Sequence, residues 1–270
     1  MNSLRQFAKQ NTRPAVWNAG RSAWFACRNL ASWPSVNLHP WRRESIRRLS
    51  ELENAHQGER AFVLGNGPSL NKIDISRLQT EKTFGLNRVF LAFPRWGFST
   101  SYFICVNDLV IQQSTAEVQA LRLPKFISWR SRDYLRLNDH TIFLHTTYQA
   151  PVFAKDARAR LWEGATVTYI ALQLAFFMGF DPVILVGMDH NFETKGAPNE
   201  TIVAQGKDRD HFDSRYFADG FRWQLPDLEL SERAYTMARD AYQAAGRTVL
   251  DATVGGKLTI FPKVDFNSLF

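Results

Sequence analysis

The most informative segment of the chain is Arg60-Ala-Phe-Val-Leu-Gly-Asn-Gly-Pro-Ser-Leu70. The apolar run Ala61–Leu64 is short, rich in strand-forming residues and followed by turn residues, so it predicts a buried strand. The Gly65-Asn66-Gly67 turn permits positive φ angles and leaves the backbone open to a ligand. Pro68-Ser69 suits the first turn of a helix, whose unpaired N–H groups would face an anion. The segment therefore predicts a site for a phosphate-bearing ligand, with an ordinary strand-to-helix turn as the alternative.

Two common phosphate-binding motifs do not fit this segment. A dinucleotide fingerprint requires a third glycine at the position where Leu70 stands. A Walker loop requires Gly-Lys-Ser or Gly-Lys-Thr, and neither follows the turn. The support for a ligand site must therefore come from the rest of the chain.

Length and composition indicate one large domain, or one domain with an appendage. The chain has 270 residues, of which 45% are hydrophobic, so a substantial core is expected. It contains no run of 18 apolar residues, and its N-terminus lacks a compact apolar region, so neither a transmembrane helix nor a signal peptide is expected. Cys27 and Cys105 show no metal-ligand spacing and fit a reducing cytosol. These features predict a cytoplasmic protein.

The net charge of +7 is concentrated at the N-terminus. Residues 1–58 contain nine lysines and arginines against three glutamates, so the remaining chain is almost neutral. Nucleic-acid binding is therefore not expected of the main domain. Tryptophans accompany these arginines at positions 17, 24, 33 and 41. We expect a basic, helical arm at 1–58, which either packs on the α/β domain at 59–270 or lies on a partner or on the inner-membrane surface.

After Arg60, short apolar runs alternate with helical segments. This pattern predicts a Rossmann-like, mostly parallel sheet with helices on both faces. The expected strands are Ala61–Leu64, Thr83–Leu86, Tyr102–Val106, Lys125–Ser128, Ile142–His145, Val183–Val186 and Thr248–Asp251. The expected helices are Trp41–Asn54, Thr166–Met178 and Pro226–Ala245, and an edge strand is expected before Lys263.

Asparagine follows three of the expected strands. Asn66, Asn87 and Asn107 each come directly or nearly directly after a strand. Ligands of parallel sheets bind beyond the carboxyl ends of the strands, where these side chains would meet. A carboxamide can donate to and accept from ribose hydroxyls, a base edge or a phosphate. A nucleotide pocket is therefore predicted, although a single asparagine at a strand end is more often a turn residue.

Two histidines are candidate general bases. The segment from Asn191 to Pro226 is too long for an ordinary loop and is rich in aromatic residues, so we expect a lid over the site. His211 lies in this segment between carboxylates that could orient it. His190 follows a strand beside Asp189. A solvated loop histidine and a hydrogen-bonded strand-end histidine are the respective alternatives.

Two aspartates are candidate metal ligands. Asp108 and Asp189 lie at strand ends, from which their carboxylates could reach a Mg²⁺ ion beside a diphosphate. Helix capping or turn stabilisation would explain the same positions without a metal.

An ordered set of motifs resembles a known group of proteins. The motifs are Gly65-Asn-Gly-Pro-Ser-Leu-Asn-Lys-Ile-Asp-Ile-Ser-Arg-Leu78, Phe84-Gly-Leu-Asn-Arg88, Cys105-Val-Asn-Asp108, Trp162-Glu-Gly-Ala-Thr-Val-Thr168 and Gly179-Phe-Asp-Pro-Val-Ile-Leu-Val-Gly-Met-Asp-His190. Together they resemble bacterial lipooligosaccharide sialyltransferases and the related MptE-like proteins, named for an archaeal 6-hydroxymethylpterin diphosphokinase. The resemblance covers roughly residues 60–255.

The resemblance implies roles for particular residues. The glycine turn and the asparagines after the next two strands would hold a cytidine nucleotide sugar. Thr166 matches a Thr-Ser pair that contacts the nucleotide, but Val167 replaces the serine. His211 matches the catalytic histidine of the lid by its order in the chain, with different flanking residues. The full set implied or predicted to bind the nucleotide is Gly65, Asn66, Gly67, Ser69, Asn87, Asn107, Asp108 and Thr166.

These observations predict a nucleotide-dependent transferase. The first hypothesis is a glycosyltransferase of bacterial surface-glycan synthesis, which uses a CMP-type sugar, needs no metal and has His211 or else His190 as base. Its acceptor would be a glycan-lipid near the inner membrane. The alternatives are a diphosphokinase that binds ATP and Mg²⁺ near Asp108 and Asp189, and a non-catalytic nucleotide-binding protein. A homo-oligomer is compatible with all three.

Overall fold

The computed structural model describes residues 34–270, and the chain divides between Arg43 and Glu44 into two units that are described separately. Most of the predicted arm therefore lies outside the described residues, and its packing, its membrane contact and the boundary near Gly58 stay predictions. Within the described residues, helix α3 spans Pro40–Leu52, close to the predicted Trp41–Asn54. None of the helices in this part of the chain is long and apolar enough to cross a membrane.

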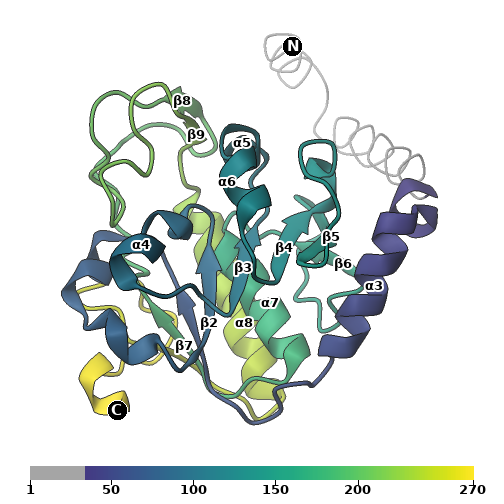
Figure 1. Cartoon of the computed structure of the whole chain (residues 1–270). Coiled ribbons are helices and arrows are strands. Elements are labelled where there is room, and N and C mark those ends of the chain that lie inside the picture. Colours follow the sequence, from purple (N-terminus) through teal and green to yellow (C-terminus); the bar gives the residue numbers. More distant parts are fainter. Residues whose placement is uncertain (1–33) are drawn as a thin grey trace, which may run out of the picture. The chain divides into compact units, whose positions relative to one another are not determined.

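The main unit contains an eight-stranded, entirely parallel sheet (Figure 1), which confirms the predicted α/β class. Its strand order is β10-β7-β1-β2-β3-β4-β5-β6. The strands are β1 (Ala61–Leu64), β2 (Lys82–Leu86), β3 (Tyr102–Cys105), β4 (Lys125–Ser128), β5 (Thr141–Thr147), β6 (Arg160–Trp162), β7 (Val183–Val186) and β10 (Val249–Asp251). All seven predicted strands are present, and β6 is additional.

The longer helices are α7 (Val167–Met178) and α8 (Leu228–Ala244), which pack together on one face of the sheet. Shorter helices are α4 (Phe93–Trp96), α5 (Asp108–Gln113) and α6 (Thr115–Ala120). Five 3₁₀ turns complete the described elements: η1 (Pro68–Lys72), η2 (Ile75–Leu78), η3 (Val89–Leu91), η4 (Trp129–Ser131) and η5 (Phe266–Leu269).

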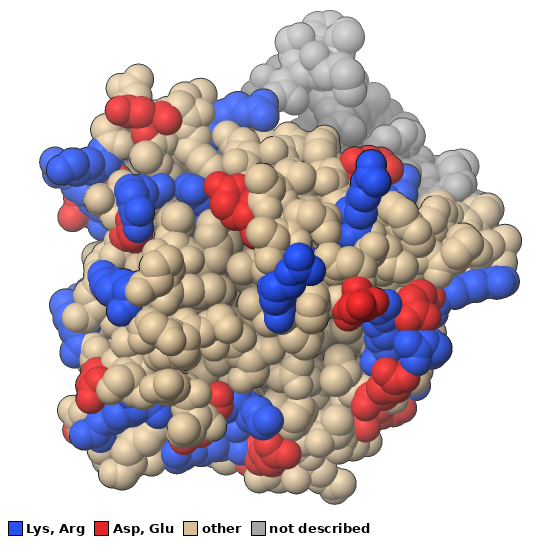
Figure 2. Space-filling model, viewed as in Figure 1, with Lys and Arg blue, Asp and Glu red and all other residues tan. Residues whose placement is uncertain are grey.

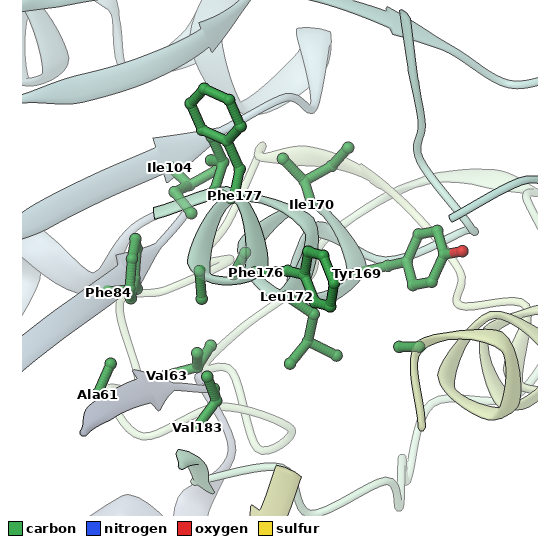
Figure 3. Close-up of a cluster of buried hydrophobic side chains, with 14 of the residues drawn as sticks. Ala61, Val63, Phe84, Ile104, Tyr169, Ile170, Leu172, Phe176, Phe177 and Val183 are labelled. Carbon is green, nitrogen blue, oxygen red and sulfur yellow. The ribbon is translucent and has the colours of Figure 1, made fainter. Parts of the chain in front are cut away.

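Helix α7 forms the centre of the core. Its residues from Thr168 to Met178 are all buried, because its apolar sequence has no polar face to present to water. Figure 3 shows side chains of α7 beside Ala61, Val63 and Phe84 of the sheet. The helix begins after Thr166, whose hydroxyl accepts a hydrogen bond from Thr168 N–H, and ends at Gly179 with φ 92°.

The opposite face of the sheet is covered mainly by short turns. Alternate strand residues point to this face, since successive side chains of a strand alternate. Phe103 packs near Phe90 of η3 at 6.2 Å between ring centroids, and Phe143 packs on Trp129 of η4 at 5.6 Å. On the surface shown in Figure 2, basic and acidic side chains are interspersed.

The segment between Asn191 and Pro226 is a lid with a little regular structure. It contains an antiparallel ribbon of β8 (Thr201–Val203) and β9 (Arg222–Gln224), which the sequence did not predict. The predicted edge strand before Lys263 was wrong, because only a single bridge joins Asp251 to Lys263. Leu258 and Phe261 of this segment are buried in the core cluster.

Candidate active site

A cavity of about 590 Å³ lies at the carboxyl-terminal edge of the sheet. Residues that follow β1, β2, β3, β5, β6 and β7 line it, and the lid closes over it. Strand β1 lies between β2 and β7. From β1 the chain first adds β2 to β6 on one side and later adds β7 and β10 on the other side. Ligands of open parallel sheets bind at such a switch point, and the predicted Gly-Asn-Gly turn is located there.

The two glycines of this turn are required for space. A Cβ atom on Gly65 would lie 2.3 Å from the carbonyl oxygen of Gly187, and one on Gly67 would lie 1.9 Å from Oδ2 of Asp189. Gly67 has φ −72°, so it does not need the positive φ that its residue type would allow. The turns after β1 and β7 therefore pack against each other too closely for any side chain.

Ser69 and Asp189 hold these two turns together. The Ser69 hydroxyl donates to Asp189 Oδ2 at 2.5 Å, and the Ser69 N–H donates to Oδ1 at 3.1 Å. Asp189 lines the cavity, whereas Ser69 is buried and does not. The aspartate thus binds the N–H and hydroxyl of a residue at the start of η1.

The three predicted asparagines do line one cavity, but they differ in what they bind. Asn107 caps helix α5, since its Oδ1 accepts from Leu109 N–H at 2.9 Å and from Val110 N–H at 3.3 Å. Within residues 34–270, the buried Oδ1 atoms of Asn66 and Asn87 have no hydrogen-bond partner. A buried acceptor without a partner costs about 1–3 kcal/mol, so a ligand that donates a hydrogen bond to either oxygen would relieve that cost.

The N-terminus of α7 also opens into the cavity. Thr166, Val167 and Thr168 line it, and the preceding residues Gly164 and Ala165 have φ of 57° and 59°. The partial positive charge of a helix N-terminus favours an anion such as a phosphate. Because this attraction comes from backbone N–H groups, Val167 does not remove it.

His211 is the most closely held candidate base. Its Nδ1 lies 2.8 Å from Oδ2 of Asp208, and Tyr216 stacks on its ring at 4.0 Å between centroids. Burial acts to raise the pKa of Asp208, but hydrogen bonds from His211 and from the N–H groups of Asp210 and Phe217 outweigh it and hold the pKa below its usual value. Asp208 is therefore ionised at neutral pH. His211 lines the cavity, and no hydrogen bond to its Nε2 is present among residues 34–270.

His190 also lines the cavity and has its own acidic partner. Its Nε2 lies 2.8 Å from Oε1 of Glu232 on α8, and its backbone has φ 53°. The Glu232 side chain is 52% exposed, whereas that of Asp208 is 5% exposed, so Glu232 orients its histidine less firmly. This difference makes His190 a weaker candidate base than His211.

The lid is joined directly to the predicted ligand turn. The Phe212 N–H donates to the carbonyl oxygen of Asn66 at 2.8 Å, and Asn71 Nδ2 donates to the carbonyl oxygen of Phe212 at 2.8 Å. Arg88 Nη1 donates to the carbonyl oxygen of Arg215 at 3.0 Å. The lid residues beside His211 are therefore bound to the segments that follow β1 and β2.

Asp108 lies outside the cavity lining. Its carboxylate accepts from Arg130 Nε at 3.0 Å and from the Ser131 hydroxyl at 2.8 Å. Asp189 is likewise bound by Ser69. Both carboxylates thus already accept hydrogen bonds from the protein, and a metal site stays a prediction.

Several residues of the site were not identified from the sequence. Asp208 does not line the cavity itself but pairs with His211 three residues later, and the only available signal was a carboxylate close to a histidine in the lid. Glu163 and Tyr148 line the cavity. They follow β6 and β5, and the first of these strands was too short and too polar to recognise.

The comparisons with known proteins are sparse. No family model and no curated protein matches this chain. Among solved structures, the chain is similar to the MAf glycosyltransferase from Magnetospirillum magneticum AMB-1, with a TM-score of 0.51 and 14% sequence identity. The similarity covers 96% of this chain but 43% of that protein, so the chain spans less than half of its length. The main unit therefore has a glycosyltransferase-like α/β fold.

Proposed function

We propose that the protein is a glycosyltransferase that uses a nucleotide-activated sugar. The observation that carries this proposal is the convergence of an Asp208–His211 pair and the unpartnered carboxamides of Asn66 and Asn87 on one cavity at the switch point of the sheet. The glycosyltransferase-like fold supports the same class. The motif resemblance favours a CMP-type donor and an acceptor from bacterial surface-glycan synthesis.

In this mechanism the nucleobase of the donor lies at Asn66 and Asn87, and the phosphate of the donor lies towards the N-terminus of α7. The acceptor hydroxyl attacks the anomeric carbon of the sugar, and the bond from that carbon to the phosphate oxygen breaks. The nucleotide leaves with the electron pair of that bond. Nε2 of His211 takes the hydroxyl proton, while Asp208 holds Nδ1–H and stabilises the imidazolium.

Nucleotide binding is tested first, by a thermal-shift panel of CMP, CDP, UDP, GDP and ATP with and without Mg²⁺. A ligand at a hundred times its Kd stabilises a protein by about 2.7 kcal/mol, which is readily detected. We expect a shift with CMP that does not need Mg²⁺. An ATP shift that requires Mg²⁺, without a CMP shift, would favour the diphosphokinase alternative. The absence of any shift would overturn the proposal.

The catalytic assignment is tested by His211→Ala. Loss of a placed base lowers transfer by about 10²–10⁴-fold, so the variant should bind CMP normally and transfer little sugar from a CMP-linked donor. His140→Ala is the matched control, because His140 does not line the cavity. Normal transfer by His211→Ala would exclude His211 as the base. If the wild type and both variants bind CMP and none of them transfers sugar, the non-catalytic alternative is favoured.

A further inference from the structure

An ion cluster joins the ends of the strands from β3 to β6, beyond β1 and β2, which Asn66 and Asn87 follow. Its centre is Arg130, whose Nε donates to Asp108 at 3.0 Å and whose Nη1 lies 2.7 Å from Oε1 of Glu163. The same guanidinium donates to the Thr146 hydroxyl at 2.8 Å. One arginine thus connects the carboxyl ends of β3, β4, β5 and β6.

The cluster holds one aromatic ring at the cavity rim. Arg130 Nη2 donates to the Tyr148 hydroxyl at 2.8 Å, and the guanidinium carbon lies 4.3 Å from the centroid of the Tyr148 ring. Tyr148 nevertheless remains 62% exposed and lines the cavity. An exposed aromatic side chain ordinarily moves between rotamers. The Tyr148 side chain is instead held by Arg130, which binds its hydroxyl and lies over the face of its ring.

Glu163 lies directly beside Tyr148 in the cavity wall. Its N–H donates to the carbonyl oxygen of Thr147 at 2.9 Å, where β5 and β6 end. Burial raises the pKa of Glu163, and the adjacent Arg130 opposes this effect. Burying the Glu163 carboxylate is costly, and its pairing with the partly exposed Arg130 contributes little net stability, so such a pair at a cavity is a candidate for a functional role.

Tyr148 lies away from the two asparagines that would hold the nucleobase. Strand β5 is the fourth neighbour from β1 in the sheet order. At about 4.8 Å per strand, the ends of β1 and β5 are roughly 19 Å apart. Glu163 lies nearer the proposed phosphate, because its carbonyl oxygen accepts from the N–H of Thr166 at the start of α7 at 3.1 Å. A nucleotide bound at Asn66 and Asn87 would therefore leave Tyr148 free, with Glu163 close to the phosphate and the sugar that it carries.

We propose that Tyr148 and Glu163 form a carbohydrate subsite, which binds the acceptor glycan of the transferase; this step rests on the proposed function. The apolar face of a pyranose ring packs on an exposed, fixed aromatic ring. The hydroxyls at the edge of the sugar donate to the carboxylate that lines the wall beside it. Arg130 is a positioning residue that keeps both groups in place.

The test uses the full chain with saturating CMP and four probes: the methyl glycosides of glucose, galactose, N-acetylglucosamine and rhamnose. Saturation-transfer NMR reports which sugar protons contact the protein. We expect at least one probe to bind, with affinity reduced about fivefold or more in Tyr148→Ala and retained in Tyr148→Phe, which keeps the ring. Tyr134→Ala is the matched control, because Tyr134 is 45% exposed and outside the cavity lining.

The outcomes separate this inference from the proposed function. The CMP thermal shift, measured on the same four proteins, should not change, since three strands separate β5 from β1 and Tyr148 is not among the residues proposed to hold CMP. If CMP shifts the melting temperature but no glycoside binds, or if Tyr148→Ala binds the sugar as the wild type does, the subsite is refuted and the nucleotide site stands. If no nucleotide binds, the proposed function fails whatever the sugars do.

Discussion

Nδ1 of His211 lies 2.8 Å from Oδ2 of Asp208, and the same carboxylate accepts hydrogen bonds from the backbone N–H groups of Asp210, His211 and Phe217. A single ionised side chain thus organises this part of the lid and orients the imidazole. The histidine tautomer with the proton on Nδ1 leaves Nε2 free to accept a proton. The Asp208 carboxylate therefore both stabilises the fold of the lid and positions the candidate base.

Replacing Asp208 by asparagine should impair transfer more than binding. In Asp208→Asn the imidazolium loses its anionic partner, so we expect kcat for sugar transfer to fall about 10²-fold with CMP affinity unchanged. Steady-state kinetics with a CMP-linked donor measures both. Asp213→Asn is the control, because Asp213 is a lid carboxylate that pairs with Arg215 and does not touch His211. Equal losses in the two variants would contradict the role of Asp208.

The stability of the lid should depend on pH in the acidic range. The folded-state pKa of Asp208 lies below its ordinary value of 3.8, so its ionised form stabilises the fold at higher pH. That contribution is complete above the ordinary value and is lost as pH falls through the lower folded value. We expect hydrogen exchange in residues 208–217 to accelerate below about pH 4, relative to the core. In Asp208→Asn the exchange of the same segment relative to the core should hardly change over this range.

Removing the Asn71 side chain should loosen the lid without unfolding the sheet. Asn71 Nδ2 donates to the Phe212 carbonyl, and its Oδ1 accepts from Arg95 Nη2 at 2.8 Å. Loss of about 1 kcal/mol of hydrogen bonding should open the lid about fivefold more often in Asn71→Ala. Hydrogen exchange of the lid, with β1 as internal reference, measures this. Gln79→Ala, an exposed residue after η2, should have no effect, and an unchanged lid in Asn71→Ala would show that this anchor is unimportant.

A methyl group on Gly67 should break the contact between the turns after β1 and β7. It would overlap the Asp189 carboxylate, so we expect Gly67→Ala to lower the free energy of unfolding by about 2 kcal/mol and to weaken CMP binding. Urea denaturation and calorimetric titration with CMP measure the two effects. In Gly206→Ala the methyl group meets open space at φ 75°, so backbone strain of about 1 kcal/mol is expected with unchanged binding. Normal CMP binding by Gly67→Ala would place the nucleotide elsewhere.

Much of the sheet follows from local sequence. The strands β1, β4 and β7 have the predicted boundaries. β1 and β7 are short apolar runs that end at turn residues, and β4 is a short apolar pair flanked by Lys125 and Ser128. Helix α7 is almost as well defined, since Thr166 caps its start and Gly179 ends it. The convergence of Asn66, Asn87 and Asn107 also followed from strand ends alone, given a parallel sheet. Such features depend on neighbours in the chain.

Other features depend on residues that meet only after folding. The ribbon of β8 and β9 pairs strands that are three residues long, too short for an alternating pattern to be recognised. Asn107 is the cap of α5, whereas Asn66 and Asn87 keep unpartnered oxygens, and residue type cannot distinguish these outcomes. The Arg130 cluster joins the ends of four strands, a grouping that exists only once the sheet has formed.

The sequence by itself therefore determined the parallel sheet, its buried helix and the edge at which a ligand would bind, because apolar periodicity and turn residues act over a few neighbouring positions. The tertiary structure decided which of the candidate side chains are available for chemistry. It joined Asp208 to His211, engaged His190 with Glu232 and tied Asp108 to Arg130. The physical reason is that packing decides which partner lies within hydrogen-bonding distance of a polar side chain. The bond to that partner then determines what the side chain can do.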